Sequence, residues 1–383
     1  FYLGNSDTKS IRLKYCRAEG FKRFVTMHQV YGDSETDMTL AEADLVSIEN
    51  SFFQRAGEHV LYNYYCERFN YVIKNNAIDG CGLMYGDWPS AYNIRIENNV
   101  LSNTQIQPIN ISGATAYSTN GTAIDTHFVT IKNNSITFAS SFVPNIAIGV
   151  NTRNIEGTSD NTPMRIYEVV DNVITSSHRS GTIYVQGDDD AAETLQAIIK
   201  NNELDRTNYS SIEVSRLKGG TISGNTMIKA FSSQGYYSSW YNNGAINVYH
   251  STVDIVDNVI DSSFAAGIYF SSSIGRIDSN TVTRNASGIR IEGSFEQSST
   301  PLVRHNNVTN NIYQGIWVSN YASPTINYND LFSNSTESDY VDISNEVSNT
   351  IYSELNARLN YWGEATTAVM ITPAMSSGAE GGL

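Results

Sequence analysis

An acidic segment of the chain carries residues that could do acid–base chemistry. The segment "GDDDAAE" holds Asp188, Asp189 and Asp190, and Glu213 lies in the next repeat of the chain. Two carboxyl groups about 5 to 10 Å apart can cleave a glycosidic bond. Glu213, Asp188 and Asp190 are therefore candidate catalytic residues of a hydrolase. Clustered carboxylates also suit calcium, so Asp188, Asp189 and Asp190 form a candidate calcium site, the only cofactor the sequence suggests; a plain solvated loop is the third interpretation.

A basic group could instead support an eliminative lyase. Arg216 and Lys218 end one strand-like segment, and Tyr249 and His250 end the next. Elimination requires a cation to neutralise a uronate carboxylate and a base to remove the α proton. Arg216 and Lys218 could supply the cation, and Tyr249 or His250 could supply the base. Charged residues beside a turn are the simpler interpretation of the same group.

Aromatic and polar residues recur at one position of successive strand-like segments. Rings can stack on the apolar faces of sugars, while amides, carboxylates and arginine bind hydroxyl groups. The competing interpretation is an ordinary solvated sheet, where Tyr and Trp are common strand residues. Glu292 and Arg290 share a strand face and could simply pair, and Glu292 lies roughly 15 Å from Glu213, too far for a catalytic pair. Besides Arg216 and Lys218, the candidate substrate-binding residues are Tyr184, Trp240, Tyr269, Arg290, Glu292 and Trp317.

The elements that must position these residues are repeats. A phrase such as "IRIENNVLSN" recurs with an asparagine marker, and several successive markers are 22 to 26 residues apart. Ser51 and Cys16 can hold the same place earlier in the chain. An inward asparagine in stacked coils can bond its own coil and the next, which predicts a structural column. The markers are Asn76, Asn99, Asn134, Asn172, Asn202, Asn225, Asn258, Asn280, Asn306 and Asn329.

A second phrase lies between the markers, in segments such as "GTIYVQG", "GAINVYH" and "SGIRIEG". Its apolar residues alternate with variable ones, the period of a strand with one buried face. Such a repeat predicts a solenoid of β-coils, in which stacking completes the core. Insertions after or before this phrase would gather on one face: 113–127, 151–165, 187–195, 231–243 and 293–301.

The pattern from about Ile11 to Leu331 resembles the right-handed parallel β-helix proteins of the pectate-lyase-like superfamily. The resemblance implies an all-β, single-domain solenoid of about a dozen coils with a C-terminal cap, over residues 1–372, and a linker or tail at 373–383. The segment "NARLNYWGEATTAVM" resembles the closing part of β-helix modules in large secreted or surface proteins of bacteria. There Tyr361 and Trp362 would close the end of the core.

Composition limits the partners. The chain has 383 residues, a net charge of −15 and a pI of about 4.8, which disfavours nucleic acid. Three cysteines are too few for a disulfide framework, and we expect buried thiols. No apolar run approaches a membrane span. Many Asn, Ser, Thr and Tyr residues suit a secreted or cell-surface protein, and the opening Phe1 suggests part of a longer chain.

These observations predict an extracellular protein that binds and cleaves a polysaccharide on the loop-walled face. A glycoside hydrolase is favoured over a lyase because an acidic surface suits a neutral or weakly charged glycan. The alternative is a non-catalytic adhesin, spacer or glycan-binding module of a larger surface protein.

Overall fold

The computed structural model describes most of the chain, and its strands all pair in parallel. The chain divides into two compact units: unit 1 comprises Phe1–Glu203 and Leu217–Gly219, and unit 2 comprises Leu204–Arg216 and Gly220–Leu383. No helix occurs among the described residues. The described residues are 1–4, 10–30, 44–87, 90–116, 127–139, 146–152, 165–175, 182–187, 195–231, 243–334, 342–346 and 355–363.

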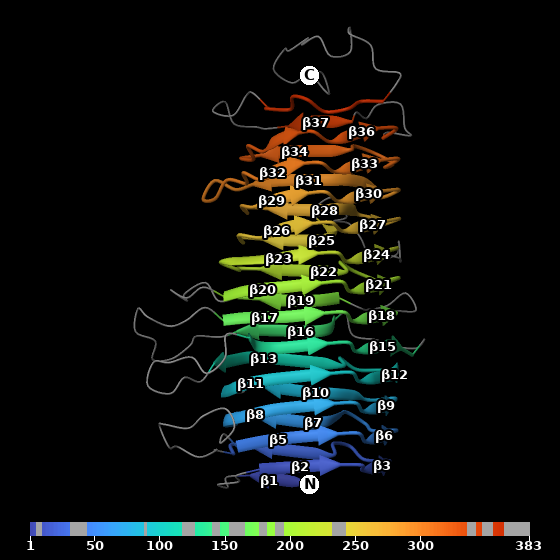
Figure 1. Ribbon diagram of the computed structural model, residues 1–383, viewed down its shortest axis with the longest axis vertical. Helices are drawn as coiled ribbons and strands as arrows, with labels where there is room; N and C mark the ends of the chain where they lie inside the picture. Colours follow the sequence, from blue (N-terminus) through green and yellow to red (C-terminus); the bar gives the residue numbers. More distant parts are fainter. Residues whose placement is uncertain are drawn as a thin grey trace. The chain divides into compact units, whose positions relative to one another are not determined.

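Unit 1 is built from coils of three short strands, so that its strands form three faces, named A, B and C (Figure 1). Face A contains β1 (Tyr2–Gly4), β4 (Val25–His28), β7 (His59–Tyr64), β10 (Gly82–Asp87), β13 (Ile109–Ala116), β16 (Ile146–Thr152) and β19 (Thr182–Gln186). Face B contains β2 (Ser10–Lys14), β5 (Asp44–Glu49), β8 (Glu67–Lys74), β11 (Ser90–Glu97), β14 (His127–Lys132), β17 (Arg165–Val170) and β20 (Leu195–Lys200). Face C contains β3 (Arg17–Glu19), β6 (Phe52–Gln54), β9 (Ala77–Asp79), β12 (Val100–Thr104), β15 (Ser135–Phe138) and β18 (Val173–Thr175).

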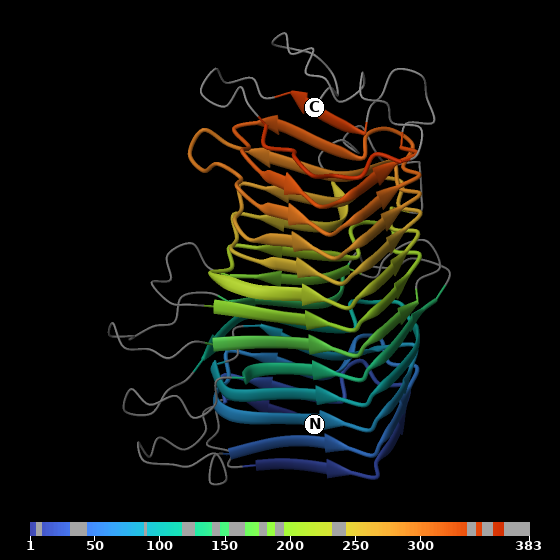
Figure 2. The ribbon, with the colours of Figure 1, turned by 45° about the horizontal axis from the view of Figure 1, so that its top comes forward.

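Unit 2 repeats the three-face arrangement, and Figure 2 shows its coils from a second direction. Two strands, β21 (Glu203–Asp205) and β23 (Gly219–Ser223), contain residues of both units. Face A contains β22 (Ile212–Ser215), β25 (Gly244–Tyr249), β28 (Ala266–Ser271), β31 (Ser287–Gly293), β34 (Ile316–Asn320) and β37 (Ile343–Glu346). Face B adds β26 (Asp254–Val256), β29 (Arg276–Asp278), β32 (Leu302–Arg304) and β35 (Thr325–Asn327). Face C contains β24 (Thr226–Ile228), β27 (Val259–Asp261), β30 (Thr281–Thr283), β33 (Asn307–Thr309) and β36 (Asp330–Phe332).

The expected all-β solenoid of about a dozen coils is confirmed, since face C alone has 12 strands among the described residues. Alternate apolar residues of the short strands form the core, as Ile246, Val248, Ile268 and Phe270 do in β25 and β28. One coil cannot enclose these side chains, so the core exists only where coils stack. The predicted boundary between residues 372 and 373 lies outside the described residues.

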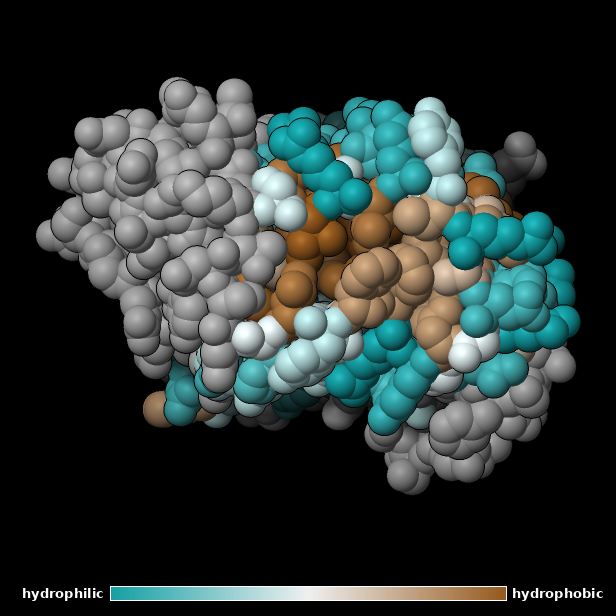
Figure 3. Space-filling view, turned by 90° about the horizontal axis from the view of Figure 1, so that it is seen from below, coloured by the Kyte–Doolittle hydropathy of each residue, from teal (hydrophilic) through white to brown (hydrophobic). Residues whose placement is uncertain are grey.

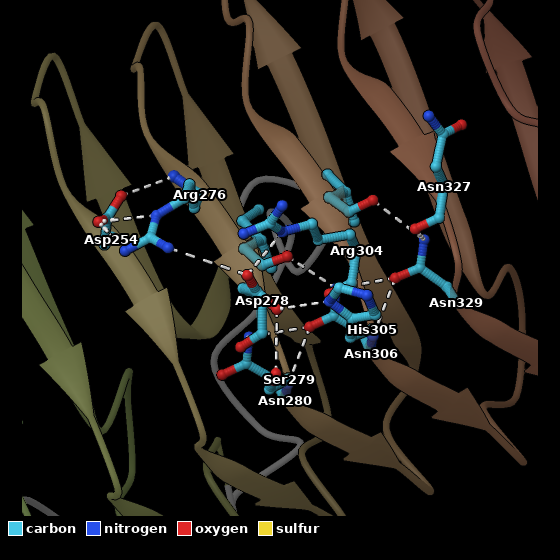
Figure 4. A network of polar contacts seen from close by, with 12 residues as sticks. Asp254, Arg276, Asp278, Ser279, Asn280, Arg304, His305, Asn306, Asn327 and Asn329 are labelled. Carbon is cyan, nitrogen blue, oxygen red and sulfur yellow. Dashed lines mark hydrogen bonds and ion pairs between the residues drawn. The ribbon is translucent and has the colours of Figure 1, made fainter.

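The asparagine column is confirmed as a ladder of side-chain hydrogen bonds. In unit 2, Asn280 donates from its backbone N and from Nδ2 to Oδ1 of Asn306, at 2.9 Å each. Asn306 in turn donates to Asn329, at 3.0 and 2.9 Å. In unit 1 the same bonds join Asn76, Asn99 and other markers, and Ser51 and Cys16 extend the column as predicted, since Cys16 N donates to Ser51 Oγ at 3.0 Å. Figure 4 shows the rungs from Asn280 to Asn329.

The residue before each marker lies in the left-handed backbone region. Asn75, Asn98 and Asn133 in unit 1 have φ of 57°, 56° and 54°. His305 and Tyr328 in unit 2 have φ of 53° and 58°. Among residues with a side chain, asparagine is one of those that tolerate this region best, so the pair "NN" in the repeat encodes the turn and the rung together.

Two further polar columns in unit 2 also join each coil to the next by hydrogen bonds from backbone N–H groups to side-chain oxygens. A second asparagine ladder runs from Asn285 through Asn311 to Asn334, and Asn334 Nδ2 donates to Asp342 Oδ1 at 2.7 Å. Burial raises the pKa of the Asp342 carboxyl. A serine ladder joins Ser251, Ser273 and Ser299 through backbone N–H groups that donate to Oγ at 3.0 Å each. Each column therefore fixes one corner of the coils.

The end of the described chain adds one rung to the first ladder. Asn329 donates from its backbone N and from Nδ2 to Asn360 Oδ1, at 2.9 Å each. Tyr361 then pairs with face C, because Leu331 N donates to its carbonyl oxygen at 2.7 Å. The Tyr361 ring packs edge-on against Phe332, with centroids 5.8 Å apart, and Tyr361 stays about half exposed at 48%. The role of this segment as a cap remains a prediction, because residues 364–383 lie outside the described ones.

The opposite end of the chain, in unit 1, leaves apolar side chains exposed. Phe1 and Tyr2 are exposed, and Figure 3 shows a hydrophobic patch at this end with hydrophilic residues along part of its border. Phe1 packs edge-on against Phe24, with centroids 5.5 Å apart. The three cysteines are free thiols; the expectation of buried thiols is confirmed for Cys66 and Cys81, whereas Cys16 is partly exposed. Within the described residues, no helix is long and apolar enough to cross a bilayer.

Candidate functional site

The outward positions of face A in unit 2 line up as the sequence predicts. In β-sheet register, Glu213 pairs with Asn247, Asn247 with Tyr269, Tyr269 with Arg290, and Arg290 with Trp317. The next outward position in each strand places Tyr249 beside Ser271, and Ser271 beside Glu292. We name the first set the outward column.

The outward column is not an open solvated sheet surface. Asn247 is 1% exposed, Tyr269 is 4% and Arg290 is 6%, although all three point away from the apolar core. Trp317 and Glu213 are partly exposed. Polar side chains that are buried on an outward face need partners of their own, so the packing around Arg290 is informative.

Four residues pack together here and form what we name the Arg290 cluster: Tyr269, Arg290, Glu292 and Trp317. The Arg290 guanidinium lies 4.0 Å from the centroid of the Trp317 ring and 5.5 Å from that of Tyr269. Its Nη2 donates to Glu292 Oε2 at 3.2 Å, so the predicted Arg290–Glu292 pair exists. Nε and Nη1 of Arg290 are buried and have no hydrogen-bond partner among the described residues. The ring faces stabilise the guanidinium charge by cation–π attraction, but two of its donors still lack an acceptor among the described residues.

Three donors hold the Glu292 carboxylate in place. Tyr269 donates its hydroxyl to Oε2 at 2.7 Å, and Arg290 donates to the same oxygen. Asn320, at the end of β34, donates its Nδ2 to Oε1. The carboxylate is thus oriented by side chains from three consecutive coils, while 17% of its side chain stays exposed. A fixed, partly exposed carboxylate is suited to accept hydrogen bonds from a ligand's hydroxyl groups.

Two tyrosines beside the cluster hold their protons tightly. Burial, together with the hydrogen bond to Glu292, raises the pKa of Tyr269 to about 12. Burial and the nearby carboxylates of Glu213 and Glu292 raise the pKa of Tyr249. The two rings pack edge-on, with centroids 5.6 Å apart. A general base works best with a pKa near the working pH, so these phenols are better suited to hydrogen bonding than to proton abstraction.

Only one residue of the predicted acidic site, Glu213, lies within the described residues. Asp188, Asp189, Asp190 and Trp240 lie outside the described residues. Glu213 lies on β22 and accepts a hydrogen bond from Ser210 Oγ at 3.2 Å. Its position in the outward column is three strands from that of Arg290, so Glu213 and Glu292 are roughly 14 Å apart, and the expectation that they cannot act as a catalytic pair agrees with the register.

The predicted basic group lies at the ends of consecutive face A strands, as the sequence predicts for Arg216, Tyr249 and His250. Arg216 and His250 follow consecutive strands of face A, and Arg216 N donates to the carbonyl of Tyr249 at 3.1 Å. The side chains of Arg216, His250 and Lys218 are exposed, whereas Tyr249 is largely covered. Lys218 belongs to unit 1. His250 Nδ1 lies 3.4 Å from Gln297 Oε1, within hydrogen-bond distance.

The remaining predicted residue, Tyr184, lies on face A of unit 1. It is in register with Gly149, and its hydroxyl donates to Gln186 Oε1 at 2.5 Å. Its ring is half-buried. Tyr184 therefore belongs to the outward surface of unit 1.

Unit 1 also holds an aromatic stack that sequence reasoning missed. Tyr62 and Tyr85 are in register, with rings 5.2 Å apart and 5° from parallel. Arg23 lies over the Tyr62 ring, 3.6 Å from its centroid, and pairs with Glu58. The segments "HVLYNY" and "GLMYGD" carry the same alternation as the later strands, and this signal could have revealed them.

The described residues contain no candidate metal site. No group of three or more His, Cys, Asp or Glu residues in the described ranges could hold a metal ion. The proposed calcium ligands Asp188, Asp189 and Asp190 are outside those ranges, so calcium binding stays a prediction.

Comparison with known proteins agrees with the fold. A family model described as "Right handed beta helix region" matches residues 149–331, which include all of the outward column and all of the Arg290 cluster. The chain is a right-handed parallel β-helix. The same comparisons found no match among curated proteins and none among solved structures. The match suggests a carbohydrate-active or surface β-helix protein, and the chemistry of the cluster must carry any finer statement.

Proposed function

We propose that this protein binds a polysaccharide outside the cell, along the outward surface of face A in unit 2. The observation that carries the proposal is the Arg290 cluster. It combines a partly exposed indole, a fixed carboxylate and a guanidinium with two unused donors. Rings stack on the apolar faces of sugars, and planar polar groups bind their hydroxyls.

The unused donors of Arg290 support a ligand site. A buried donor without an acceptor costs about 1–3 kcal/mol, and folded proteins retain few of them. The Nε and Nη1 groups of Arg290 are donors of this kind among the described residues. A ligand oxygen at the edge of the cluster would give the guanidinium an acceptor after a small movement of the rings.

The charge of the site favours a neutral or weakly charged glycan. Glu292 neutralises Arg290 within the cluster, and Glu213 adds a negative charge along the same column. The chain as a whole carries −15, which repels strongly anionic polymers over the Debye length. Specificity for sugar hydroxyls is therefore expected to exceed specificity for uronate carboxylates.

Cleavage is the less supported part of the expected function. A hydrolase needs a second carboxyl group within about 10 Å of the first; the register separates Glu213 from Glu292 by more than that, and the predicted partners Asp188 and Asp190 lie outside the described residues. A lyase needs a base, and the raised pKa values of Tyr249 and Tyr269 do not favour one there. The described contacts support binding, while Asp188 or Asp190 as the partner of Glu213 and His250 as a lyase base stay predictions.

The test is a binding screen of the full chain against neutral and uronic-acid polysaccharides, by affinity electrophoresis and calorimetry. Trp317→Ala and Glu292→Gln should each weaken binding of the positive polysaccharide by about tenfold or more, which corresponds to about 1.4 kcal/mol. Phe264→Ala is the control, because Phe264 is a half-exposed ring before β28, outside the cluster.

The same incubations report cleavage. New reducing ends would show a hydrolase, and ultraviolet absorbance from unsaturated uronates would show a lyase. Binding that both cluster variants retain at full strength would refute the site, and a wild-type chain that binds no polysaccharide in a broad panel would refute the function.

A further inference from the structure

The loop between β31 and β32 presents an aromatic ring to solvent. Phe295 is 85% exposed, although burying a phenylalanine stabilises a fold by about 1.5–3 kcal/mol. The loop has defined hydrogen bonds: Ser294 N donates to the carbonyl of Gln297 at 2.9 Å, and Gln297 N donates to Ser294 Oγ at 3.1 Å. A ring on such a fixed turn is held in solvent by the fold.

The base of this loop is tied to the preceding coil. Thr300 N donates to the carbonyl of Ser273 at 3.3 Å, and Ser273 N donates to Ser299 Oγ at 3.0 Å. Ser299 is itself fully buried. The serine ladder thus anchors the point where the loop returns to face B, so the position of Phe295 depends on a structural column.

The exposed ring continues the Arg290 cluster. Phe295 packs edge-on against Tyr321, with centroids 5.9 Å apart. Tyr321 directly follows Asn320, whose amide holds the Glu292 carboxylate. Phe295 itself lies three residues after Glu292 in the chain. Phe295 therefore lies just after β31, which carries Arg290 and Glu292, and Tyr321 lies just after β34, which carries Trp317.

The other side of the loop reaches back toward Tyr249. Gln297 Oε1 lies 3.4 Å from His250 Nδ1, and His250 directly follows Tyr249 on β25. One loop thus contacts residues that follow β25 and β34, two coils before and one coil after its own. Gln297 therefore lies near the end of β25, and Phe295 lies near the end of β34.

We infer that Phe295 and Tyr321 form a second stacking subsite, which binds one pyranose ring of the polysaccharide next to the ring bound at the Arg290 cluster. This inference rests on the proposed function and names a specificity-determining part of it. The apolar face of a pyranose covers the exposed Phe295 ring, while Asn320 and Gln297 offer polar groups for the hydroxyls. The occupant is a sugar of the same glycan chain, because the subsite is continuous with the cluster.

The subsite predicts a dependence on oligosaccharide length. The affinity for a short oligosaccharide that fills only the cluster should not depend on Phe295. A longer one that spans both sites should gain affinity from the second ring. Because Phe295 is 85% exposed, Phe295→Ala removes little packing, so a loss of binding would not reflect unfolding.

The experiment measures Kd by calorimetry for a length series of oligosaccharides from the polysaccharide that wild-type protein binds. Phe295→Ala should weaken binding of the long oligosaccharides about five- to tenfold and leave the short ones within about twofold. Phe295→Trp should retain wild-type affinity for the long ones. Phe264→Ala, which removes an exposed ring elsewhere in unit 2, should match wild type throughout.

Three results would overturn the inference. If Phe295→Ala binds every length as wild type does while Trp317→Ala loses binding, the subsite is wrong and the proposed function stands. An equal loss in Phe295→Ala and Phe264→Ala would show a non-specific surface effect. If the wild-type chain binds no polysaccharide, the proposed function fails and the subsite fails with it.

Discussion

The asparagine ladder and the outward column of face A run along the same coils of unit 2 but use the repeat in opposite ways. Each rung of the ladder repeats one residue with the same bonds, as Asn280 and Asn306 do. The outward column places a different residue on each strand: Glu213, Asn247, Tyr269, Arg290 and Trp317. Every coil needs the same corner, so the ladder is uniform, whereas a ligand contacts each coil at a different point.

The two columns also differ in how their polar groups are satisfied. Asn306 makes three bonds through Nδ2, to Ile277, Arg304 and Asn329. Arg290 leaves two N–H groups without an acceptor among the described residues. A fully satisfied polar column stabilises the coil stack, and an incompletely satisfied one is suited to receive a ligand.

The largest effect is expected for Asn306→Ala. The change removes the donors to two backbone carbonyls and the acceptor for the Asn280 N–H, which leaves several buried groups unpaired. At about 1–3 kcal/mol per unpaired group, we expect the free energy of unfolding to fall by about 3–5 kcal/mol, measured by denaturant titration.

Asn307→Ala is the matched control, because Asn307 is the next residue and is exposed. It should change the free energy of unfolding by no more than about 0.5 kcal/mol. Similar losses in the two variants would mean that the ladder contributes no more than an ordinary surface asparagine, and the contrast between the two columns would disappear.

A smaller effect is expected for Arg290→Met. Glu292 would lose its cation but keep the hydrogen bonds from Tyr269 and Asn320. The side chain of Glu292 is 17% exposed, so the loss should reach only about 1–2 kcal/mol, below the cost of breaking a fully buried pair.

A double-mutant cycle with Glu292→Gln isolates the pair. The double variant should be less destabilised than the sum of the single variants, since each single change leaves one charge uncompensated. Additive losses would show that Arg290 acts through packing against Trp317 rather than through its charge.

The smallest effect is expected at the charged network on face B, around Asp278 (Figure 4). Burial alone would raise the pKa of Asp278, but hydrogen bonds from Arg304, His305 and Ser279 outweigh it and lower the pKa below its ordinary value. A depressed folded-state pKa gives stability that is present above the unfolded-state pKa, about 4, and is lost as pH falls through the folded-state value.

Asp278→Asn should therefore destabilise by about 1 kcal/mol or less at neutral pH, and the difference from wild type should shrink below about pH 4. Thermal unfolding across pH measures this difference, and Asp330→Asn, at an exposed position, is the control. A difference that stays constant down to low pH would show that the carboxylate charge plays no part.

Much of the fold could be predicted from local pattern. The marker asparagines form the ladder, Ser51 and Cys16 extend it, and the outward column has the predicted register, because a period of 22 to 26 residues places equivalent positions in adjacent coils. The second ladder through Asn285 and Asn311 was missed, since it spans fewer coils and its repetition is weaker in the sequence.

The candidate site could be predicted only in part. Tyr269, Arg290, Glu292 and Trp317 were named from their spacing, and the structure brings all four together. The aromatic stack of Tyr62 and Tyr85 in unit 1 was missed, although its strands alternate in the same way. Spacing shows which residues share a surface, but it does not show which of them touch.

The sequence by itself determined the coil, its corners and the residues that face outward. These features depend on the strand alternation and the turn residues, which are present within each single repeat. Only the tertiary structure decided that Arg290 is buried between two rings, that Glu292 is held from three coils, and that Phe295 meets Tyr321. Those contacts join side chains from different coils and from a loop. Their geometry depends on side-chain rotamers and loop conformation, which no repeat period specifies.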